Sequence, residues 1–134
     1  MVTALLSAAL VINELMASNA GIVMSPATNF DSWIEVYNPG EEAVNLGGMY
    51  LSNDAQNLKL WQLPSNIGNV PAKGFKVLWL GSNDILSTHA PFKLDCDGDT
   101  IFLSDRQGEL VVSQDYPASI SRSSYARTSD GGED

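Results

Sequence analysis

The sequence predicts an all-β fold, an antiparallel sandwich or barrel, from the spacing of its apolar runs. Runs of about four to eight residues recur roughly every 10–15 residues, with turn-forming residues between them. No window shows the 3.6-residue apolar period of an amphipathic helix. The chain has 134 residues, of which 44% are hydrophobic, so it suits one domain with its own core.

The expected strands follow one another along the chain. They are the apolar runs over residues 10–16, 32–38, 43–52, 58–63, 75–81, 100–105 and 109–114. The second run alternates, which places Ile34 and Val36 on one face of a strand. The other face then carries Trp33, Glu35 and Tyr37.

Two other runs depart from simple alternation. Gly47 and Gly48 interrupt the third run, which predicts a bulge or a tight bend. The run 75–81 is nearly all apolar, as in a strand that is buried on both faces. We therefore expect Trp79 to be the most deeply buried tryptophan.

Turn chemistry predicts an antiparallel meander over residues 92–114. Asp97-Gly98 tolerates the positive φ angles of a tight turn, so this pair is expected to connect the first two strands of the meander. Residues 104–108 form the second predicted loop, with Gly108 in the left-handed conformation at its end.

The N-terminal run over residues 2–12 carries no charge. It is too short for a spanning helix, which needs about 20 apolar residues. We interpret residues 1–9 as a signal-peptide remnant, an added leader or the start of the first strand. Residues 10–134 are assigned to one domain, and no later run is expected to insert into a membrane.

The charge balance limits the classes of partner. Acidic residues number 16 and basic residues 7, for a net charge of −9, and the basic residues do not cluster. Such a chain repels phosphate polymers and anionic lipids, so nucleic acid is not an expected partner. The single cysteine, Cys96, excludes an internal disulfide and a metal site built from several cysteines.

Short motifs provide a further clue to the fold. Residues 33–39 read Trp-Ile-Glu-Val-Tyr-Asn-Pro, and residues 44–53 read Val-Asn-Leu-Gly-Gly-Met-Tyr-Leu-Ser-Asn. Both stretches resemble consecutive strands of the lamin tail domain family. Further motifs follow in the family's order, at residues 61–64, 70–75, 92–105 and 124–131. Each motif is weak alone, but their order is specific, and the resemblance covers about residues 10–131.

The resemblance implies an immunoglobulin-like antiparallel β-sandwich. Family members mediate protein contacts in animal nuclear filaments and also occur in bacterial secreted or surface proteins. With no heptad rod and no basic surface, the chain better matches the bacterial type, which predicts a secreted or cell-surface location; the lack of disulfides leaves the cytoplasm open. Met49 replaces a usual tryptophan and Ser129 a frequent proline, and the end at Asp134 leads us to expect a fragment of a longer protein.

The sharpest polar feature is the alternation of Asp95, Asp97 and Asp99. Alternating carboxylates chelate Ca²⁺ when a loop curls around the ion. The EF-hand pattern fails, because Thr100 stands at its sixth position and Arg106 at its twelfth. A weak calcium site and a solvated turn both remain open here, and no other cofactor is expected.

No assembled catalytic group is apparent, so the chain is predicted not to be an enzyme. His89 has no nucleophile-elbow motif to serve, and the carboxylates beside Cys96 disfavour a thiolate. Glu14 and Glu35 form the one carboxylate pair considered for glycoside chemistry, but both fall in expected strands.

Several residues are assigned structural roles. Asn38 and Pro39 begin the turn after the second run, where a missing amide donor does no harm, and Gly98 belongs to the turn of the first predicted hairpin. Glu35 and Arg127 both belong to family motifs. We expect a salt bridge between them that holds the C-terminal segment on the sheet.

Aromatic residues leave two functions open. Trp33, Trp61 and Tyr50 are candidates for a platform on which sugars stack, although aromatic side chains in a sandwich are more often part of the core. The first prediction is therefore a non-catalytic module that binds a protein partner or a neighbouring domain of the same chain. The alternative is a carbohydrate-binding module attached to a secreted hydrolase.

Overall fold

The computed structural model describes residues 10–16, 32–81, 90–92, 94, 98–117 and 125–126. The strands are β1 (Val11–Met16), β2 (Ser32–Tyr37), β3 (Val44–Asn45), β4 (Tyr50–Ser52), β5 (Trp61–Gln62), β6 (Asn69–Val70), β7 (Phe75–Leu80), β8 (Gly98–Ser104), β9 (Leu110–Pro117) and β10 (Tyr125–Ala126). The 3₁₀ turn η2 (Ser65–Ile67) lies between β5 and β6. The described part of the chain is therefore all-β, as predicted, and it contains no helix that could span a membrane.

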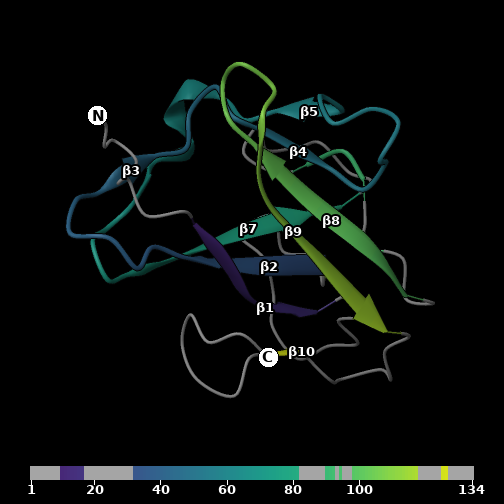
Figure 1. Cartoon of the computed structure of the whole chain (residues 1–134), viewed down its shortest axis with the longest axis horizontal. Coiled ribbons are helices and arrows are strands. Elements are labelled where there is room, and N and C mark those ends of the chain that lie inside the picture. Colours follow the sequence, from purple (N-terminus) through teal and green to yellow (C-terminus); the bar gives the residue numbers. More distant parts are fainter. Residues whose placement is uncertain are drawn as a thin grey trace, which may run out of the picture.

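The strands form two four-stranded sheets and the two-stranded ribbon β3–β6. The first sheet has the order β10-β1-β2-β7 and the second the order β5-β4-β8-β9, and all their neighbouring strands are antiparallel. Figure 1 shows β8 and β9 running obliquely to β2 and β7. The two sheets are the layers of a β-sandwich.

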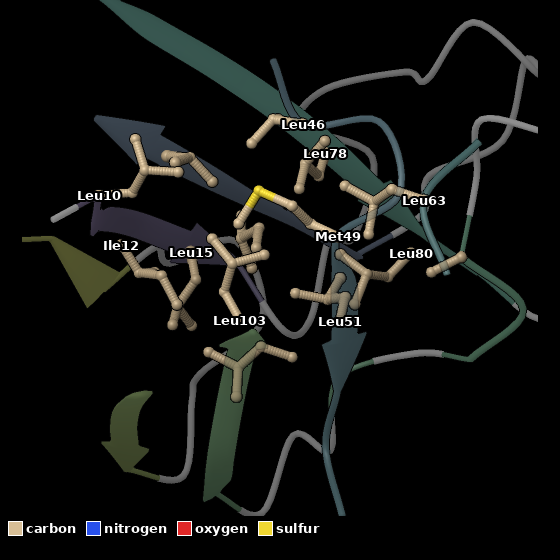
Figure 2. Packing of buried hydrophobic residues seen from close by; sticks show 14 of the residues in the cluster. Leu10, Ile12, Leu15, Leu46, Met49, Leu51, Leu63, Leu78, Leu80 and Leu103 are labelled. Carbon is tan, nitrogen blue, oxygen red and sulfur yellow. The ribbon is translucent and has the colours of Figure 1, made fainter. Parts of the chain in front are cut away.

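The core between the two sheets is almost entirely aliphatic. Met49 is 5% exposed, and Figure 2 shows it in the middle of the labelled leucine and isoleucine side chains. Ile34 and Val36 are fully buried in this core, so the predicted alternation of β2 is confirmed. The buried members of the core are Leu10, Ile12, Leu15, Ile34, Val36, Leu46, Met49, Leu51, Leu63, Ile67, Val70, Leu78, Leu80, Ala90, Leu94, Ile101, Leu103 and Tyr116.

The second hairpin of the predicted meander is confirmed. It joins β8 to β9, and its loop is closed by Asp105 N donating to Glu109 O at 2.8 Å and Gly108 N donating to Asp105 O at 2.9 Å. Gly108 has a φ of 86°, so the left-handed residue predicted at the end of the loop is present.

The first predicted hairpin is not tested as a whole. Phe92 and Leu94 lie outside strands, although Leu94 is buried in the core. Residues 93 and 95–97 lie outside the described residues, as do residues 1–9 at the N-terminus. The interpretations given to these segments therefore stay predictions.

The strand predicted over residues 75–81 requires a correction. β7 lies at the edge of its sheet, and its buried Leu78 and Leu80 alternate with Phe75 and Val77, which are exposed. The prediction that this strand is buried on both faces is wrong. An unbroken apolar run cannot distinguish a central strand from an edge strand whose outer face is also apolar.

Two smaller predictions also fail. Trp79 is half-buried, whereas Trp33 is only 9% exposed, so Trp79 is not the most deeply buried tryptophan. The strand predicted over residues 58–63 shrinks to β5, because residues 58–60 form a turn and a bend. The loop that begins at residue 53 thus continues to residue 60, although the apolar pattern places the start of the strand at residue 58.

Candidate interaction surface

The side chains of β2 and β7 that point away from the core share one face of the first sheet. Ile34 and Val36 enter the core, so alternation turns their neighbours outward. These neighbours form directly opposed pairs across the two strands: Trp33 with Trp79, Glu35 with Val77, and Tyr37 with Phe75. We call these residues the β2–β7 outer face.

One end of the β2–β7 outer face is apolar and open to solvent. Phe75 is 41% exposed and Val77 is 37% exposed. The rings of Tyr37 and Phe75 lie 5.0 Å apart between centroids, with an interplanar angle of 39°, which is a tilted aromatic pair. Phe75 and Val77 thus form a small exposed apolar patch beside the Tyr37 ring.

The other end of this face is closed. Trp33 is 9% exposed, and its neighbour across the β1–β2 ladder, Met16, is 4% exposed. The indole Nε1 of Trp33 is buried without a hydrogen-bond partner among the described residues. The accessible part of the β2–β7 outer face is therefore the part around Phe75 and Val77.

The outer edge of β7 is partly unpaired. Ala90 occupies its C-terminal end, where Ala90 N donates to Trp79 O and Gly81 N donates to Ala90 O, both at 2.9 Å. Since backbone groups alternate in direction along a strand, the N–H and C=O groups of Val77 and Phe75 point the same way as the carbonyl of Trp79. Within the described ranges, β7 has no strand on this side next to Phe75 and Val77.

Polar residues lie beside Val77 on the same face. Glu35 is opposite Val77 on one side and opposite Glu14 of β1 on the other. The Nδ2 of Asn13 donates to Glu35 Oε1 at 2.9 Å. Asn13 reaches this position from a bulge, where the β1–β2 register shifts between Ile12 and Glu14. Glu14 and Glu35 are thus neighbours on strands, as expected, and they add negative charge beside the apolar patch.

The three aromatic residues predicted to bind sugars are not brought together. Trp33 lies on the first sheet, whereas Trp61 packs against the core from β5. Tyr50 points away from the core on β4, opposite Gln62, and Lys59 Nζ lies 5.6 Å from the centroid of its ring. The Lys59 ammonium therefore occupies the ring face that a sugar would need.

The calcium prediction falls mostly outside the described residues. Asp95 and Asp97 are not described, and Asp99 is exposed in β8, where its Oδ1 accepts from Thr100 N at 2.9 Å. Thr100 Oγ1 in turn donates to Asp115 Oδ1 at 2.7 Å. Within the described ranges no group of three histidine, cysteine or acidic side chains is placed to hold a metal. His89, Cys96 and Arg127 also lie outside these ranges, so the Glu35–Arg127 salt bridge stays a prediction.

Asn38 connects the turn after β2 to β6 through three hydrogen bonds. It is 1% exposed, and its Nδ2 donates to Glu42 O at 2.7 Å and to Val70 O at 3.1 Å. Its Oδ1 accepts from Gly40 N at 2.9 Å. The buried amide thus holds the turn after β2 against β6, next to the residues of the candidate surface.

The other two residues assigned to turns also have defined positions. The carbonyl of Pro39 accepts from Lys73 Nζ at 2.7 Å, and Lys73 Nζ lies 3.4 Å from Glu41 Oε2. Gly98 begins β8 with a φ of 98°, a left-handed conformation that favours glycine. The contacts of Lys73 with Pro39 and Glu41 bring the turn after β2 and the turn before β7 together at one end of the first sheet.

A contact that the sequence analysis did not anticipate joins the β8–β9 hairpin to the third run. Arg106 Nε donates to Gly47 O at 2.8 Å, and its Nη2 donates to Asn45 O at 3.3 Å. Gly48 has a φ of 84°, so the tight bend predicted at Gly47-Gly48 is present. No local pattern marks Arg106, because its partners lie about 60 residues earlier in the chain.

Comparison with known families identifies the domain. The family model described as Lamin Tail Domain matches residues 6–118, which is most of the chain. The chain belongs to the lamin tail domain family. Lamin tail domains have an immunoglobulin-like fold, and the two packed sheets of this lamin tail domain confirm the sandwich that the motifs implied. No curated protein and no solved structure matches the chain.

The family match agrees with the positions of the motifs in the lamin tail domain. The Trp-Ile-Glu-Val-Tyr-Asn-Pro motif is β2 and the first residues of its turn, and the Gly-Gly motif is the bend between β3 and β4. Residues of the Val-Pro-Ala-Lys-Gly-Phe motif form the turn before β7, where Gly74 N donates to Pro71 O at 2.9 Å. The described motifs are thus spread over both sheets and the turns that join them.

Proposed function

We propose that this lamin tail domain is a non-catalytic module that binds a protein partner, or a neighbouring domain of its own chain, through the β2–β7 outer face. The observation that supports this proposal is the exposure of Phe75 and Val77 beside a strand edge on which, in the part of the chain that the structure describes, they pair with no other strand. Covering the exposed 41% of Phe75 removes about 80 Å² of apolar surface from water, which contributes about 2 kcal/mol.

The family and the polar residues support a binding role. The lamin tail domain is an immunoglobulin-like, non-catalytic family. Two of the carboxylates named as candidates for catalysis or calcium binding accept hydrogen bonds within the fold: Glu35 from Asn13, and Asp99 from the backbone amide of Thr100. A secreted or cell-surface location is part of the same proposal and rests on the sequence resemblance alone.

Site-specific photocrosslinking tests the proposal. A benzophenone amino acid is placed at position 75 and, as a matched control, at position 110, because Leu110 is 50% exposed on the other sheet. In the native host extract we expect discrete protein adducts from position 75 that excess unlabelled domain suppresses. Equal adducts from both positions, or none from position 75, contradict the proposal.

A glycan array tests the carbohydrate-binding alternative. We expect no reproducible binding, because Trp33, Trp61 and Tyr50 lie at separate places and Lys59 covers the Tyr50 ring. Reproducible glycan binding that Trp61→Ala or Tyr50→Ala abolishes, with the fold retained, favours the alternative instead.

A further inference from the structure

We propose that the open stretch of the β7 edge accepts an extended peptide as an additional antiparallel strand, with lysine or arginine opposite Val77 and an apolar residue opposite Phe75. This inference rests on the proposed function and specifies the chemistry of its partner. Read from its N-terminus, the peptide carries a basic residue followed two positions later by an apolar one.

The backbone of β7 provides the first argument. Val77 presents both its N–H and its C=O to the open side, as a residue does in a hydrogen-bonded pair of an antiparallel ladder. Phe75 does the same two residues earlier. Because Ala90 already bonds to Trp79 and Gly81, the added strand can begin no earlier than the position opposite Val77. Since it is antiparallel to β7, it then runs toward the position opposite Phe75.

The rows of side chains across the sheet provide the second argument. Glu14, Glu35 and Val77 form one continuous row on the outer face, and a residue opposite Val77 extends it. That residue lies about two strand spacings, roughly 10 Å, from Glu35. A lysine or arginine there covers Val77 with its aliphatic stem and directs its charge toward the Glu35 carboxylate, whose one described donor is Asn13.

The two lysines near this edge do not oppose a basic peptide on the outer face. Lys76 is opposite Val36 and shares the face that Val36 occupies, so its side chain leaves the sheet on the other side. Lys73 is engaged by Glu41 and by the carbonyl of Pro39. Among the described residues, the charged side chain next to Val77 on the outer face is therefore that of Glu35.

A second copy of the domain fits this edge less well than a peptide. Two copies of β7 that pair antiparallel, with Phe75 of one opposite Val77 of the other, place the two Lys76 residues opposite each other. In the alternative register, with Val77 of one copy opposite Val77 of the other, Phe75 of each copy lies opposite Trp79 of its partner. The backbone carbonyl of Trp79 is not available for this pairing, because it already accepts from Ala90 N. Each copy also carries a net charge of −9, which opposes self-association.

Peptide binding followed by NMR tests the inference. The probe is acetyl-Lys-Thr-Val-Thr-Val-Thr-amide, compared with a peptide that begins with glutamate and with one N-methylated at its lysine. We expect amide shifts at Phe75 to Val77 with the lysine peptide and a dissociation constant about threefold higher for the glutamate peptide. N-methylation removes the donor to Val77 O and should raise the dissociation constant about fivefold.

Domain variants provide the matching evidence. Val77→Pro removes the outward N–H of an edge residue and replaces the side chain beneath the lysine stem, and should weaken the lysine peptide at least about fivefold. Glu35→Gln should abolish the preference for lysine over glutamate, whereas Glu109→Gln, in the exposed loop between β8 and β9, should keep it.

The possible outcomes separate the two proposals. Equal affinity for all peptides, or binding without amide shifts in β7, overturns the edge assignment. No peptide binding, with adducts from position 75 retained, overturns the added-strand inference and leaves the proposed function standing. If Val77→Pro fails to fold, the N-methylated peptide decides the backbone question on the unmodified domain.

Discussion

Asn38 uses both ends of its side-chain amide to hold a corner of the sandwich. The backbone groups that it contacts belong to the turn after β2 and to β6, so two parts of the chain far apart in sequence share one buried residue. Its backbone N–H also donates to Gly74 O at 3.0 Å, which continues the β2–β7 pairing into the turns. The side chain therefore positions the end of the sheet that carries Phe75.

Replacing Asn38 by alanine should lower the free energy of unfolding by about 3 kcal/mol, because the Val70 carbonyl is left buried without its donor. Urea denaturation measures this loss. Asn66→Ala is the matched control, since Asn66 is exposed in η2, and it should change stability by less than about 0.5 kcal/mol. Equal effects of the two substitutions contradict the assigned role.

Met49 is the second residue whose replacement is informative, because the family usually carries tryptophan there. Leucine side chains pack around the thioether of Met49 in the core (Figure 2). We expect Met49→Trp to destabilise the domain by about 1–3 kcal/mol through overpacking, and Met49→Leu to cost less than about 1.5 kcal/mol. Thermal unfolding distinguishes them, and a stabilised Met49→Trp variant shows that the core has unused space.

At the scale of elements, Arg106 fixes the tip of the β8–β9 hairpin to β3 and to the bend that follows it. The guanidinium reaches the carbonyls of Gly47 and Asn45 and packs over Gly48, where a Cβ atom would lie 3.1 Å from Arg106 Nε. The bend at Gly47-Gly48 and the hairpin tip thus form one unit, although they lie far apart in the sequence.

Arg106→Lys should destabilise the domain by about 1 kcal/mol, because one ammonium cannot reproduce the fork of donors that the guanidinium presents to two carbonyls. Chemical denaturation reports the loss, and amide exchange should accelerate at Gly48. Gln107→Ala, at the exposed neighbouring position, should leave both measurements unchanged. A variant as stable as the parent chain refutes the role given to the guanidinium.

The elements also show which features can be predicted from the sequence. Strict alternation placed the β2 side chains on the correct faces, and the Gly108 turn followed from local chemistry. β7 was misjudged because an apolar run gives no information about which neighbours it acquires. β7 is an edge strand because it pairs with β2 along one side, whereas on its other side Ala90 covers only the C-terminal end. The pairing with β2 joins residues far apart in the sequence.

At the scale of the whole molecule, the net charge of −9 opposes compaction. We expect the melting temperature to rise by a few degrees between 20 and 500 mM NaCl, since salt screens repulsion between carboxylates. The Glu42→Gln, Glu109→Gln double variant, which removes two exposed charges, should respond less. A melting temperature that falls with NaCl contradicts the expectation, and calorimetry measures both proteins.

The candidate surface itself was only partly foreseeable. The sequence analysis named Glu35 and Trp33 and their shared face, but it assigned Trp33 to a sugar platform with residues that the fold places elsewhere. The exposure of Phe75 and Val77 depends on how the sheets stack, so composition and spacing cannot indicate it. The family motifs predicted the sandwich correctly, because they record turns and strands and not which edge stays open.

Ala90 limits how long the open part of the β7 edge can be. A strand added there forms hydrogen bonds with only two residues, Phe75 and Val77, so a single such joint should release its partner quickly. A protein that contains several copies of this domain in tandem would bind its partner for longer, because the linked weak contacts add up through avidity. The same limit leaves only a short stretch of β7 on which another copy of the chain could add a strand.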